Sequence, residues 1–389
     1  MRVVFSGGGT LGSVSPLLAV AEELRKKDAA IEFLWIGTRN GPEKKLVGEY
    51  NIPFKSIIAG KWRRYFSLEN ILDLFKFGIG FLQSFLILRK FRADIFISAG
   101  SFVSVPVAIA AAFFKIPILI HQQDVVVGLA NKLISPLAQK ITVSLDVSLR
   151  DFPPEKTQLI GNPVRSSIFL GDKEKVFKKF NFKKDLPIVL VMGGGTGAMA
   201  INELVKKSLS ELVKFCQIIH LTGKGKQIIK GDSQKIENYY PIEFVTSEIY
   251  DFYAAADLIV SRAGMSSLSE ICSLGKPSIV IPIPNSHQEK NAEYFAEKGA
   301  VKVFRQPANL SFPDLIGESN KIFLDRPKPI TNIDQGLNDD KIIEFVKLVK
   351  ELLFNRGECE EMSRNAKKIM PRDAAQKMAR IIDNLFISL

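Results

Sequence analysis

The sequence has little of what usually cross-links or anchors a chain. Its 389 residues include three cysteines, an odd number with no C-x-x-C spacing, so neither a disulfide framework nor a zinc site is indicated. This usage fits a reducing cytosol. No apolar run reaches the roughly 18 residues that a membrane-spanning helix needs. The apolar run after Arg2 ends at glycines within a few residues, so we expect no signal peptide.

Two nucleotide-binding motifs are missing as well. No Gly-Lys-Ser/Thr ends the glycine-rich segments, which excludes a P-loop. The segments also lack the full dinucleotide fingerprint, and no convincing ribose-binding acid follows the expected strand at 31–36. A Rossmann dehydrogenase is therefore disfavoured.

Positive charge, by contrast, is in excess. Lys and Arg number 53 against 41 Asp and Glu, a net charge of +12. The excess favours a polyanionic partner, namely nucleic acid, anionic lipid or a phosphorylated substrate, while ordinary solubility charge explains it about as well. The length favours two domains.

A strand–helix pattern runs through the chain twice. Strands are expected at 3–6, 31–36, 95–98, 118–121 and 141–143 and, after a restart near 187, at 188–192, 218–222, 244–245, 258–260 and 278–281. Helical periodicity lies between them, as at 17–27, 105–114 and 198–215. Such alternation predicts an α/β protein with two doubly wound parallel sheets.

Proline and glycine mark the boundary between the halves, at Pro153-Pro154 and Gly161-Asn162-Pro163. We expect an N-terminal domain at 1–163 and a C-terminal domain at 164–372, with a last helix at 373–389 packing back on the first. The proline-containing stretch 306–338 is interpreted as an irregular insertion.

Each half carries a glycine-rich turn between a strand and a helix, Gly7–Ser13 and Gly193–Ala198. Glycines let backbone approach a phosphate or sugar, and a helix start favours negative charge. Two sheets that face each other with such loops would form a ligand cleft at their carboxyl edges. A tight turn without a ligand remains an alternative for either loop alone.

Three polar clusters also follow expected strands. Ser261–Ser267 could hold a diphosphate at a helix start, with Glu270 on ribose hydroxyls; a Ser267–Glu270 capping box is the alternative. Gln288 and Asn291 share one helix face and suit sugar hydroxyls. His121–Asp124 ends an apolar strand, although a lone His in such a place is more often structural.

One segment resembles a membrane-surface contact. Lys61–Phe66 is basic and aromatic, and the stretch that follows to Leu88 is strongly apolar with helical spacing. That combination is typical of an interfacial helix on anionic lipid; a buried core helix with a charged flank is the alternative. The basic residues are not spread along a recognition element, so nucleic acid is disfavoured.

Taken together, these motifs resemble the MurG family of peptidoglycan glycosyltransferases. The likeness runs nearly end to end and is carried by Gly8-Gly9-Thr10, Arg63–Leu68, Gly161–Arg165, Ala254–Asp257, Ser261–Gly264, His287-Gln288 with Asn291-Ala292, and Asp373–Ala375. This family adds N-acetylglucosamine to undecaprenyl-diphospho-N-acetylmuramoyl-pentapeptide, converting lipid I to lipid II in cell-wall biogenesis.

The resemblance implies a GT-B fold in which the C-terminal domain binds UDP-N-acetylglucosamine and the N-terminal domain binds the lipid acceptor at the cytoplasmic membrane face. By position, Arg165 would contact the nucleotide. The remaining donor residues would be Gly195, Thr196, Gly264, Ser266 and Ser267 at the diphosphate, Val245 and Ile249 at the uracil, Glu270 at the ribose, and Gln288 and Asn291 at the sugar. Thr10 and Gly12 would lie on the acceptor side.

Several acceptor-side positions depart from the family pattern. Leu11 and Ser13 stand where glycine and histidine are usual, and Asp124 replaces an asparagine. Ser13 is a poor base, so we expect Asp124 to activate the acceptor's 4-hydroxyl for an inverting transfer. His121 is the second candidate for this role. No D-x-D pair occurs. The sequence therefore predicts no metal or other cofactor, with helix dipoles and arginine neutralising the leaving diphosphate.

Other functions stay open at this point. A transferase for a different lipid-linked acceptor, a silent UDP-sugar-binding scaffold and a nucleotide-sugar epimerase would all use the same two domains. An epimerase would act without an acceptor and leave the lipid-facing segment unexplained.

Overall fold

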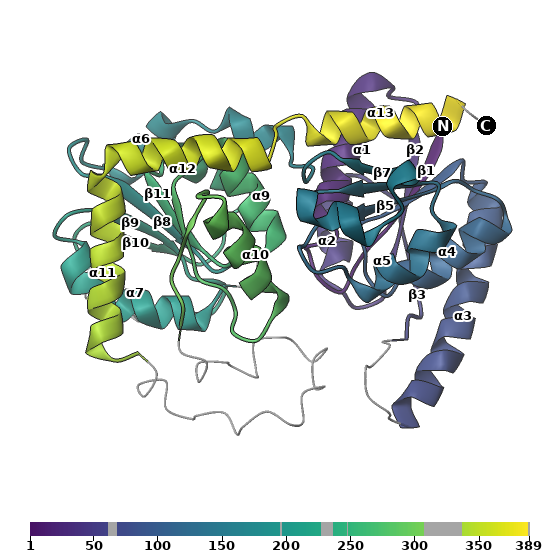
Figure 1. The fold of residues 1–389 in the computed structure, drawn as a ribbon, viewed down its shortest axis with the longest axis horizontal. Coiled ribbons are helices and arrows are strands. Elements are labelled where there is room, and N and C mark those ends of the chain that lie inside the picture. The colour runs from purple at the N-terminus through teal and green to yellow at the C-terminus, as the bar shows by residue number, and fades with distance from the viewer. Residues whose placement is uncertain (61–67, 195–196, 227–235, 247, 307–336, 388–389) are drawn as a thin grey trace. The chain divides into compact units, whose positions relative to one another are not determined.

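The computed structural model describes residues 1–60, 68–194, 197–226, 236–246, 248–306 and 337–387, with the side chains of 68–74 left aside. Its chain forms two compact units. Unit 1 is Met1–Arg165 with Met370–Leu389, and unit 2 is Ser166–Ile369 (Figure 1). Each unit is an open α/β sandwich, as the strand–helix alternation predicts.

The sheet of unit 1 is wholly parallel, in the order β3-β2-β1-β4-β5-β6-β7. Its strands are β1 (Arg2–Ser6), β2 (Glu32–Thr38), β3 (Phe54–Ile57), β4 (Ile95–Ser98), β5 (Ile118–Gln122), β6 (Lys140–Val143) and β7 (Thr157–Leu159). The strand order reverses between β1 and β4, where the carboxyl ends of neighbouring strands leave room for a ligand.

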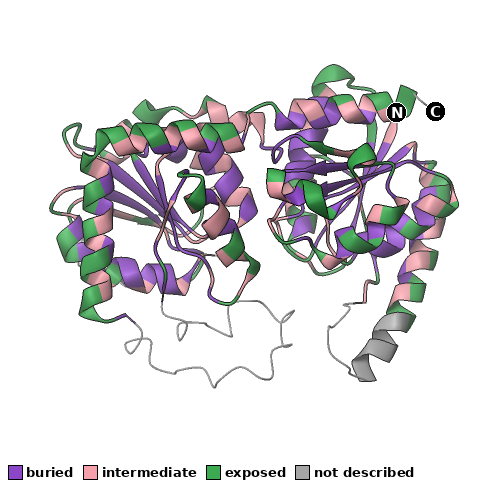
Figure 2. Ribbon diagram, in the orientation of Figure 1, coloured by how far each residue is buried: buried purple, intermediate pink, exposed green. Residues whose placement is uncertain are grey.

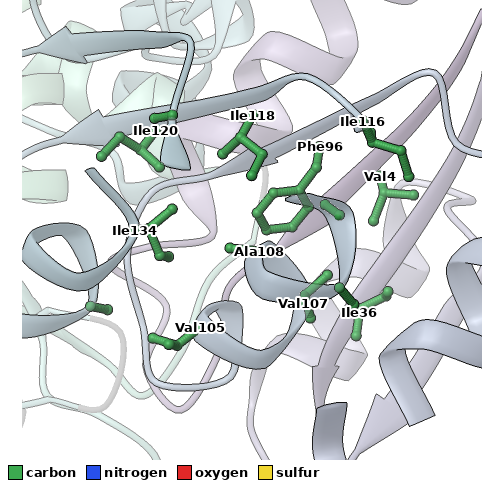
Figure 3. Close-up of a cluster of buried hydrophobic side chains, with 14 of the residues drawn as sticks. Val4, Ile36, Phe96, Val105, Val107, Ala108, Ile116, Ile118, Ile120 and Ile134 are labelled. Carbon is green, nitrogen blue, oxygen red and sulfur yellow. The ribbon is translucent and has the colours of Figure 1, made fainter. Parts of the chain in front are cut away.

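Alternate side chains of these strands build two cores. Val4, Ile36, Phe96 and Ile118 point to one face, where Val107 and its neighbours cover them (Figure 3). Their neighbours in sequence fill the opposite core: Val3, Phe5, Trp35, Ile97 and Leu119. A strand that is buried on both faces needs apolar residues at nearly every position, which is why these strands are continuous apolar runs.

Helices cover both faces of the unit 1 sheet. They are α1 (Ser15–Lys27), α2 (Glu43–Glu49), α3 (Leu68–Phe91), α4 (Ser104–Phe113), α5 (Leu129–Ile134) and α13 (Ala374–Ile387), with 3₁₀ turns at Ser135–Leu137, Asp146–Asp151 and Pro154–Lys156. The last helix, α13, packs on α1 through Met378, Ala379 and Ile382, all of which are buried. The chain therefore ends in the unit in which it begins.

Unit 2 repeats the design, with a parallel sheet in the order β10-β9-β8-β11-β12-β13. Its strands are β8 (Ile188–Met192), β9 (Gln217–Leu221), β10 (Tyr239–Ile242), β11 (Leu258–Ser261), β12 (Ser278–Val280) and β13 (Lys302–Val303). The strand predicted at Phe244–Val245 is wrong, because the edge strand is β10 and ends at Ile242. Phe244 is 58% exposed in the loop that follows.

The helices of unit 2 again cover two faces, and their buried sides are clear in Figure 2. They are α6 (Lys173–Phe180), α7 (Met199–Leu212), α8 (Ile249–Ala255), α9 (Met265–Leu274), α10 (His287–Glu297), α11 (Asp339–Phe354) and α12 (Arg356–Ile369), with a 3₁₀ turn at Ser166–Leu170. The predicted insertion lies almost entirely at 307–336, outside the described residues.

Candidate functional site

The acceptor-side residues predicted from sequence follow β1 and β5, the two neighbours of β4 in the unit 1 sheet. The loop after β1 carries Thr10, Gly12 and Ser13, and the segment after β5 carries Asp124. Thr10 is exposed and Gly12 is half-buried. Ser13 is buried, and its hydroxyl has no hydrogen-bond partner among the described residues. Parallel strands therefore bring these segments to one edge of the sheet.

His121 lies in the same strand end but points into the protein. Its side chain is fully buried. Nδ1 lies 2.9 Å from Oγ1 of Thr142, and Nε2 lies 2.9 Å from Oδ1 of Asn162 and 3.1 Å from Oγ of Ser144. Burial lowers the pKa of the imidazole to about 4. These contacts tie β5 to β6 and to the chain after β7, which is a structural role; the proton-transfer role predicted for His121 has no support in them.

Asp124 is half-buried at the start of a loop that side-chain amides hold. The Gln122 amide donates to the backbone carbonyls of Asp124, at 2.7 Å, and Val126, at 3.2 Å. Asn131 in turn donates to Oε1 of Gln122, at 2.8 Å, and to the carbonyl of His121, at 3.0 Å. This network holds in place the backbone that carries the Asp124 side chain.

In unit 2 the predicted donor residues follow the neighbouring strands β8, β11 and β12. The second glycine loop leaves β8, the Ser266–Glu270 segment follows β11, and Gln288 follows β12. The strand order reverses between β8 and β11. Gly195 and Thr196 fall outside the described residues, so their predicted contact stays a prediction.

The flanking glycines of that second loop are needed for close packing. Gly197 has φ +72°, and an added Cβ would overlap the carbonyl of Thr222; one on Gly193 would overlap the backbone of Ala198. The two described ends of the loop are therefore tightly packed, Gly193 against the start of α7 and Gly197 against the segment after β9.

Helix α9 begins without a side-chain cap. Its N-cap is Gly264, with extended backbone angles, and no described side chain accepts a hydrogen bond from its first turn as a cap. Ser267 is the third helical residue and not the N-cap, so the capping-box alternative for Ser267 and Glu270 is wrong. The first-turn amides and the hydroxyls of Ser266 and Ser267 form a helix start of the kind that binds phosphate.

Glu270, one turn further along α9, is oriented by a residue that the sequence analysis missed. The buried hydroxyl of Tyr253, on α8, lies 2.9 Å from Oε2 of Glu270. Tyr253 sits inside a short helix, 17 residues before Glu270 in the sequence, and no motif links the two. The hydrogen bond fixes one carboxylate oxygen of a half-buried group.

Gln288 and Asn291 share a face of α10, as predicted, but have different surroundings. The Gln288 side chain lies beside Gly264: a Cβ added there would be 3.8 Å from Nε2. Asn291 is fully buried and donates to the carbonyl of Ala263 at 3.2 Å. Asn291 thus braces the turn before α9, while its predicted sugar contact is unsupported by this position.

Arg262 lies within the predicted Ser261–Ser267 segment, but its role in that segment was not predicted. Its Nη1 donates to the carbonyls of Ile281 and Pro282, at 3.0 and 3.3 Å, and to Oε1 of Gln306, at 3.0 Å. Burial lowers the pKa of the guanidinium to about 10, so it stays charged at neutral pH. This cation ties the loop after β11 to the loop after β12.

The remaining predicted residues have these places. Val245 follows β10 and Ile249 begins α8, and both side chains pack against the core. Their backbone would thus carry any uracil contact. Arg165 is the last residue of the first segment of unit 1, where Nη1 lies 3.3 Å from the hydroxyl of Tyr50. Burial raises the pKa of the neighbouring Glu22 carboxyl, and Arg165 opposes that rise.

Helix α3 presents an apolar face beyond the core of unit 1. Phe75, Leu82 and Leu86 are each more than 60% exposed, whereas Leu88 is buried. A hollow of about 290 Å³ is lined by Phe75, Gly78, Ile79 and Leu82. Lys76 and, in the last turn of the helix, Arg89 and Lys90 are exposed on α3 as well. One side of α3 is therefore buried as the core-helix alternative expects, and the other side is exposed. The basic and aromatic segment Lys61–Phe66 lies outside the described residues.

No helix in the described part of the chain is both long enough and apolar enough to cross a membrane.

The sequence matches the Glycosyltransferase family 28 N-terminal domain over residues 3–143 and the family's C-terminal domain over 188–353. A protein of Lachnospira eligens is 36% identical over 354 residues, covering 90% of this chain and 99% of its own length. That protein is called UDP-N-acetylglucosamine--N-acetylmuramyl-(pentapeptide) pyrophosphoryl-undecaprenol N-acetylglucosamine transferase. The chain belongs to glycosyltransferase family 28.

Other relatives from family 28 carry the same enzyme name. The protein of Clostridium perfringens strain SM101 is 38% identical over 355 residues, covering 89% of this chain and 98% of its own. The protein of Legionella pneumophila strain Lens is 36% identical, covering 89% of this chain and 96% of its own. The predicted family is thereby confirmed, and the chain is a glycosyltransferase.

Solved structures agree on the fold. MurG of Acinetobacter baumannii superposes with a TM-score of 0.68 at 23% identity, covering 98% of this chain and 99% of its own. A UDP-GlcNAc 2-epimerase from Neisseria meningitidis, bound to UDP-GlcNAc, gives a TM-score of 0.63 at 15% identity and full coverage of both chains. At such identities the likeness shows the fold alone, and it confirms the predicted GT-B architecture.

Proposed function

We propose that this chain transfers N-acetylglucosamine from UDP-N-acetylglucosamine to undecaprenyl-diphospho-N-acetylmuramoyl-pentapeptide. The observation that carries the proposal is the near full-length identity, 36–38%, to transferases of that name. In the reaction the acceptor's 4-hydroxyl attacks the anomeric carbon, UDP leaves, and the anomeric configuration inverts.

The donor is assigned to the carboxyl edge of unit 2. The uncapped start of α9 supports a diphosphate position, because helix-start amides and the helix dipole favour negative charge. The Glu270 carboxylate, held by Tyr253, can accept hydrogen bonds from ribose hydroxyls. Gln288, beside Gly264, is placed one loop away, where an amide suits a sugar hydroxyl.

The acceptor is assigned to the corresponding edge of unit 1. Asp124 is our candidate for the general base that takes the proton of the 4-hydroxyl. Its half-buried position at the end of β5, on a backbone held by Gln122, supports this role. A base must reach the proton that it removes, and the fully buried ring of His121 is a weaker candidate on that ground. No step requires a metal or other cofactor.

We also propose that unit 1 rests on the cytoplasmic face of the membrane as a peripheral protein. The exposed apolar face of α3, together with the exposed Lys76, Arg89 and Lys90 on the same helix, supports this placement. Apolar side chains at the lipid boundary combined with basic ones near anionic headgroups are how interfacial helices bind. The same arrangement brings the enzyme to an acceptor that is itself anchored in lipid.

A transfer assay tests the proposed function. Purified protein is incubated with UDP-N-acetylglucosamine labelled in the sugar and with lipid-linked N-acetylmuramyl-pentapeptide, and label is counted in the lipid extract. We expect label in lipid that depends on both substrates. A protein that binds UDP yet labels no lipid would be a silent binder, and one that changes the donor without an acceptor would be an epimerase. Either result overturns the proposal.

A further inference from the structure

A single peptide bond in the first glycine loop is held at both of its polar ends. The Gly8–Gly9 peptide presents its N–H, on Gly9, to Oε2 of Glu43 at 3.2 Å. Its carbonyl, on Gly8, accepts a hydrogen bond from Oγ of Ser101 at 2.8 Å. Glu43 begins α2 and Ser101 follows β4, so two segments distant in sequence fix the orientation of one peptide plane.

Glu43 is built into the space beneath this loop. The side chain is fully buried, and Oε1 accepts a second hydrogen bond, from the backbone N–H of Thr38 at 2.7 Å. A Cβ added at Gly8 or Gly41 would overlap the Glu43 carboxylate. A side chain at position 8 would therefore displace the Glu43 carboxylate from its hydrogen bonds, independently of any ligand.

Ser101 holds the other end from a strained conformation. Its φ is +102°, in a region that glycine enters readily and residues with a Cβ rarely do. Such strain persists only where the surroundings impose it, and it concentrates at functional sites. A glycine at 101 would relieve the strain but would lose the hydrogen bond to Gly8. The hydrogen bond to Gly8 therefore accounts for serine at position 101, since the backbone conformation alone would favour glycine.

We propose that Glu43 and Ser101 are positioning residues that prevent the Gly8–Gly9 peptide from flipping, and that this orientation sets affinity for the acceptor. The acceptor part rests on the proposed function. A peptide between two glycines, one of them Gly9 at φ +77°, has little steric barrier to reorientation. A flip at 8–9 would reverse the directions in which the Gly8 carbonyl and the Gly9 N–H point, directly before the exposed Thr10 of the loop that we assign to the acceptor side.

The decisive variant is Ser101→Gly, compared with Ser101→Ala. Both remove the hydroxyl, and only the glycine removes the strain. We expect both to raise the acceptor KM about 3- to 10-fold, the usual worth of one net hydrogen bond, with kcat and the donor KM unchanged. Ser101→Gly should keep or raise the melting temperature, whereas Ser101→Ala should not raise it. If Ser101 acted only through stability, the acceptor KM would rise only in a variant whose melting temperature falls. Ser101→Gly tests this, because it should raise the acceptor KM without lowering the melting temperature.

A second readout does not depend on turnover. Amide hydrogen exchange at Gly9 should be slow in the wild type and faster in Ser101→Gly and in Glu43→Gln, the latter leaving packing nearly unchanged. An unprotected Gly9 amide in the wild type, or a wild-type acceptor KM in Ser101→Gly, overturns the proposal. If the wild type transfers no sugar, the proposed function fails instead, and exchange at Gly9 still decides whether the peptide is held.

Discussion

Two polar side chains at the end of β5 have different surroundings although only two residues separate them. His121 is fully buried with both ring nitrogens hydrogen-bonded, and Asp124 is half-exposed on a braced loop. The histidine therefore contributes to folding, and the half-buried carboxylate is the group that we propose as the base. The difference in burial arises because His121 lies within β5, which is buried along its whole length, whereas Asp124 lies in the loop after the strand ends at Gln122.

We predict that Asp124→Asn lowers kcat about 100- to 10,000-fold, because that is the usual contribution of a general base. Binding of UDP-N-acetylglucosamine should stay the same, since the donor is assigned to unit 2. Initial rates and donor titrations measure the two quantities. Asp28→Asn, at an exposed carboxylate of unit 1, is the matched control and should keep the wild-type rate. Turnover of Asp124→Asn within about twofold of wild type would remove Asp124 as the base.

The buried histidines predict how stability depends on pH. Burial lowers the pKa of His121 to about 4 and that of His220, in unit 2, to about 3. The unfolded chain, with histidine near pKa 6.5, then binds more protons than the folded chain. Stability is therefore full above pH 6.5 and falls as the pH falls towards the folded pKa values. Between pH 7 and pH 5 each ring should cost about 2 kcal/mol.

Chemical denaturation at pH 7 and pH 5 measures this dependence, in a range above most carboxyl titrations. His121→Gln should flatten the pH dependence of unit 1, and His220→Gln that of unit 2, whatever each does to stability at pH 7. His287→Gln, at an exposed position, controls for the substitution itself. Equal pH dependence in the wild type and in His121→Gln would contradict a neutral, buried ring.

The residues that directly follow strands could be predicted from the sequence. The residues that hold them in place by hydrogen bonds could not. Asp124, Ser266 and Gln288 follow apolar runs, so a strand prediction alone places them at the carboxyl edge of a sheet. Tyr253 and Glu43 act through contacts 17 and 34 residues away in sequence. Such partners have no fixed spacing. They become visible only when the packing of helices on the sheet is known.

At the scale of elements, the central strands were predictable and the edge strands were not. β1, β5 and β8 are buried on both faces and read as continuous apolar runs. β3, β7 and β13 lie towards or at the edges of their sheets, are two to four residues long, and contain exposed or half-buried positions. Their apolar signal is correspondingly weak. At β10 a proline within Tyr239–Ile242 hid the strand, and the apolar Phe244–Val245 drew the prediction to the following loop.

Helix α3 carries a prediction of its own, because its outer face is apolar without being buried. Replacing Phe75, Leu82 and Leu86 together by serine should weaken binding to anionic vesicles at least about tenfold, since burying one large apolar side chain contributes about 1.5–3 kcal/mol. The melting temperature should change little, since these side chains are exposed. Co-sedimentation with vesicles and thermal unfolding measure the two effects.

The matched control uses apolar residues of unit 2 that are as exposed, Leu170 and Ile343. Replacing both by serine should leave vesicle binding at the wild-type level. Unchanged binding in the α3 variant, or equal loss in the control, would show that this face is not the membrane contact.

At the scale of the whole molecule, the chain uses one α/β design twice, with candidate residues at the carboxyl edge of each sheet. The sequence predicted this duplication, because strand–helix alternation restarts near residue 187 and each half opens with a glycine loop. It could not show which residues of each edge are exposed, since burial depends on how the loops after β1, β5, β11 and β12 pack. Burial distinguishes the half-buried Asp124 and Gln288 from the fully buried His121 and Asn291.

The central claim is that unit 2 binds the UDP-sugar at its carboxyl edge. Amide hydrogen exchange on the full chain, with and without UDP-N-acetylglucosamine, tests it directly. We predict slower exchange at 262–270 and 288–291 in the wild type, and loss of that protection at the same donor concentration in Glu270→Ala. Protection confined to unit 1, or none at a saturating donor concentration, would contradict the account.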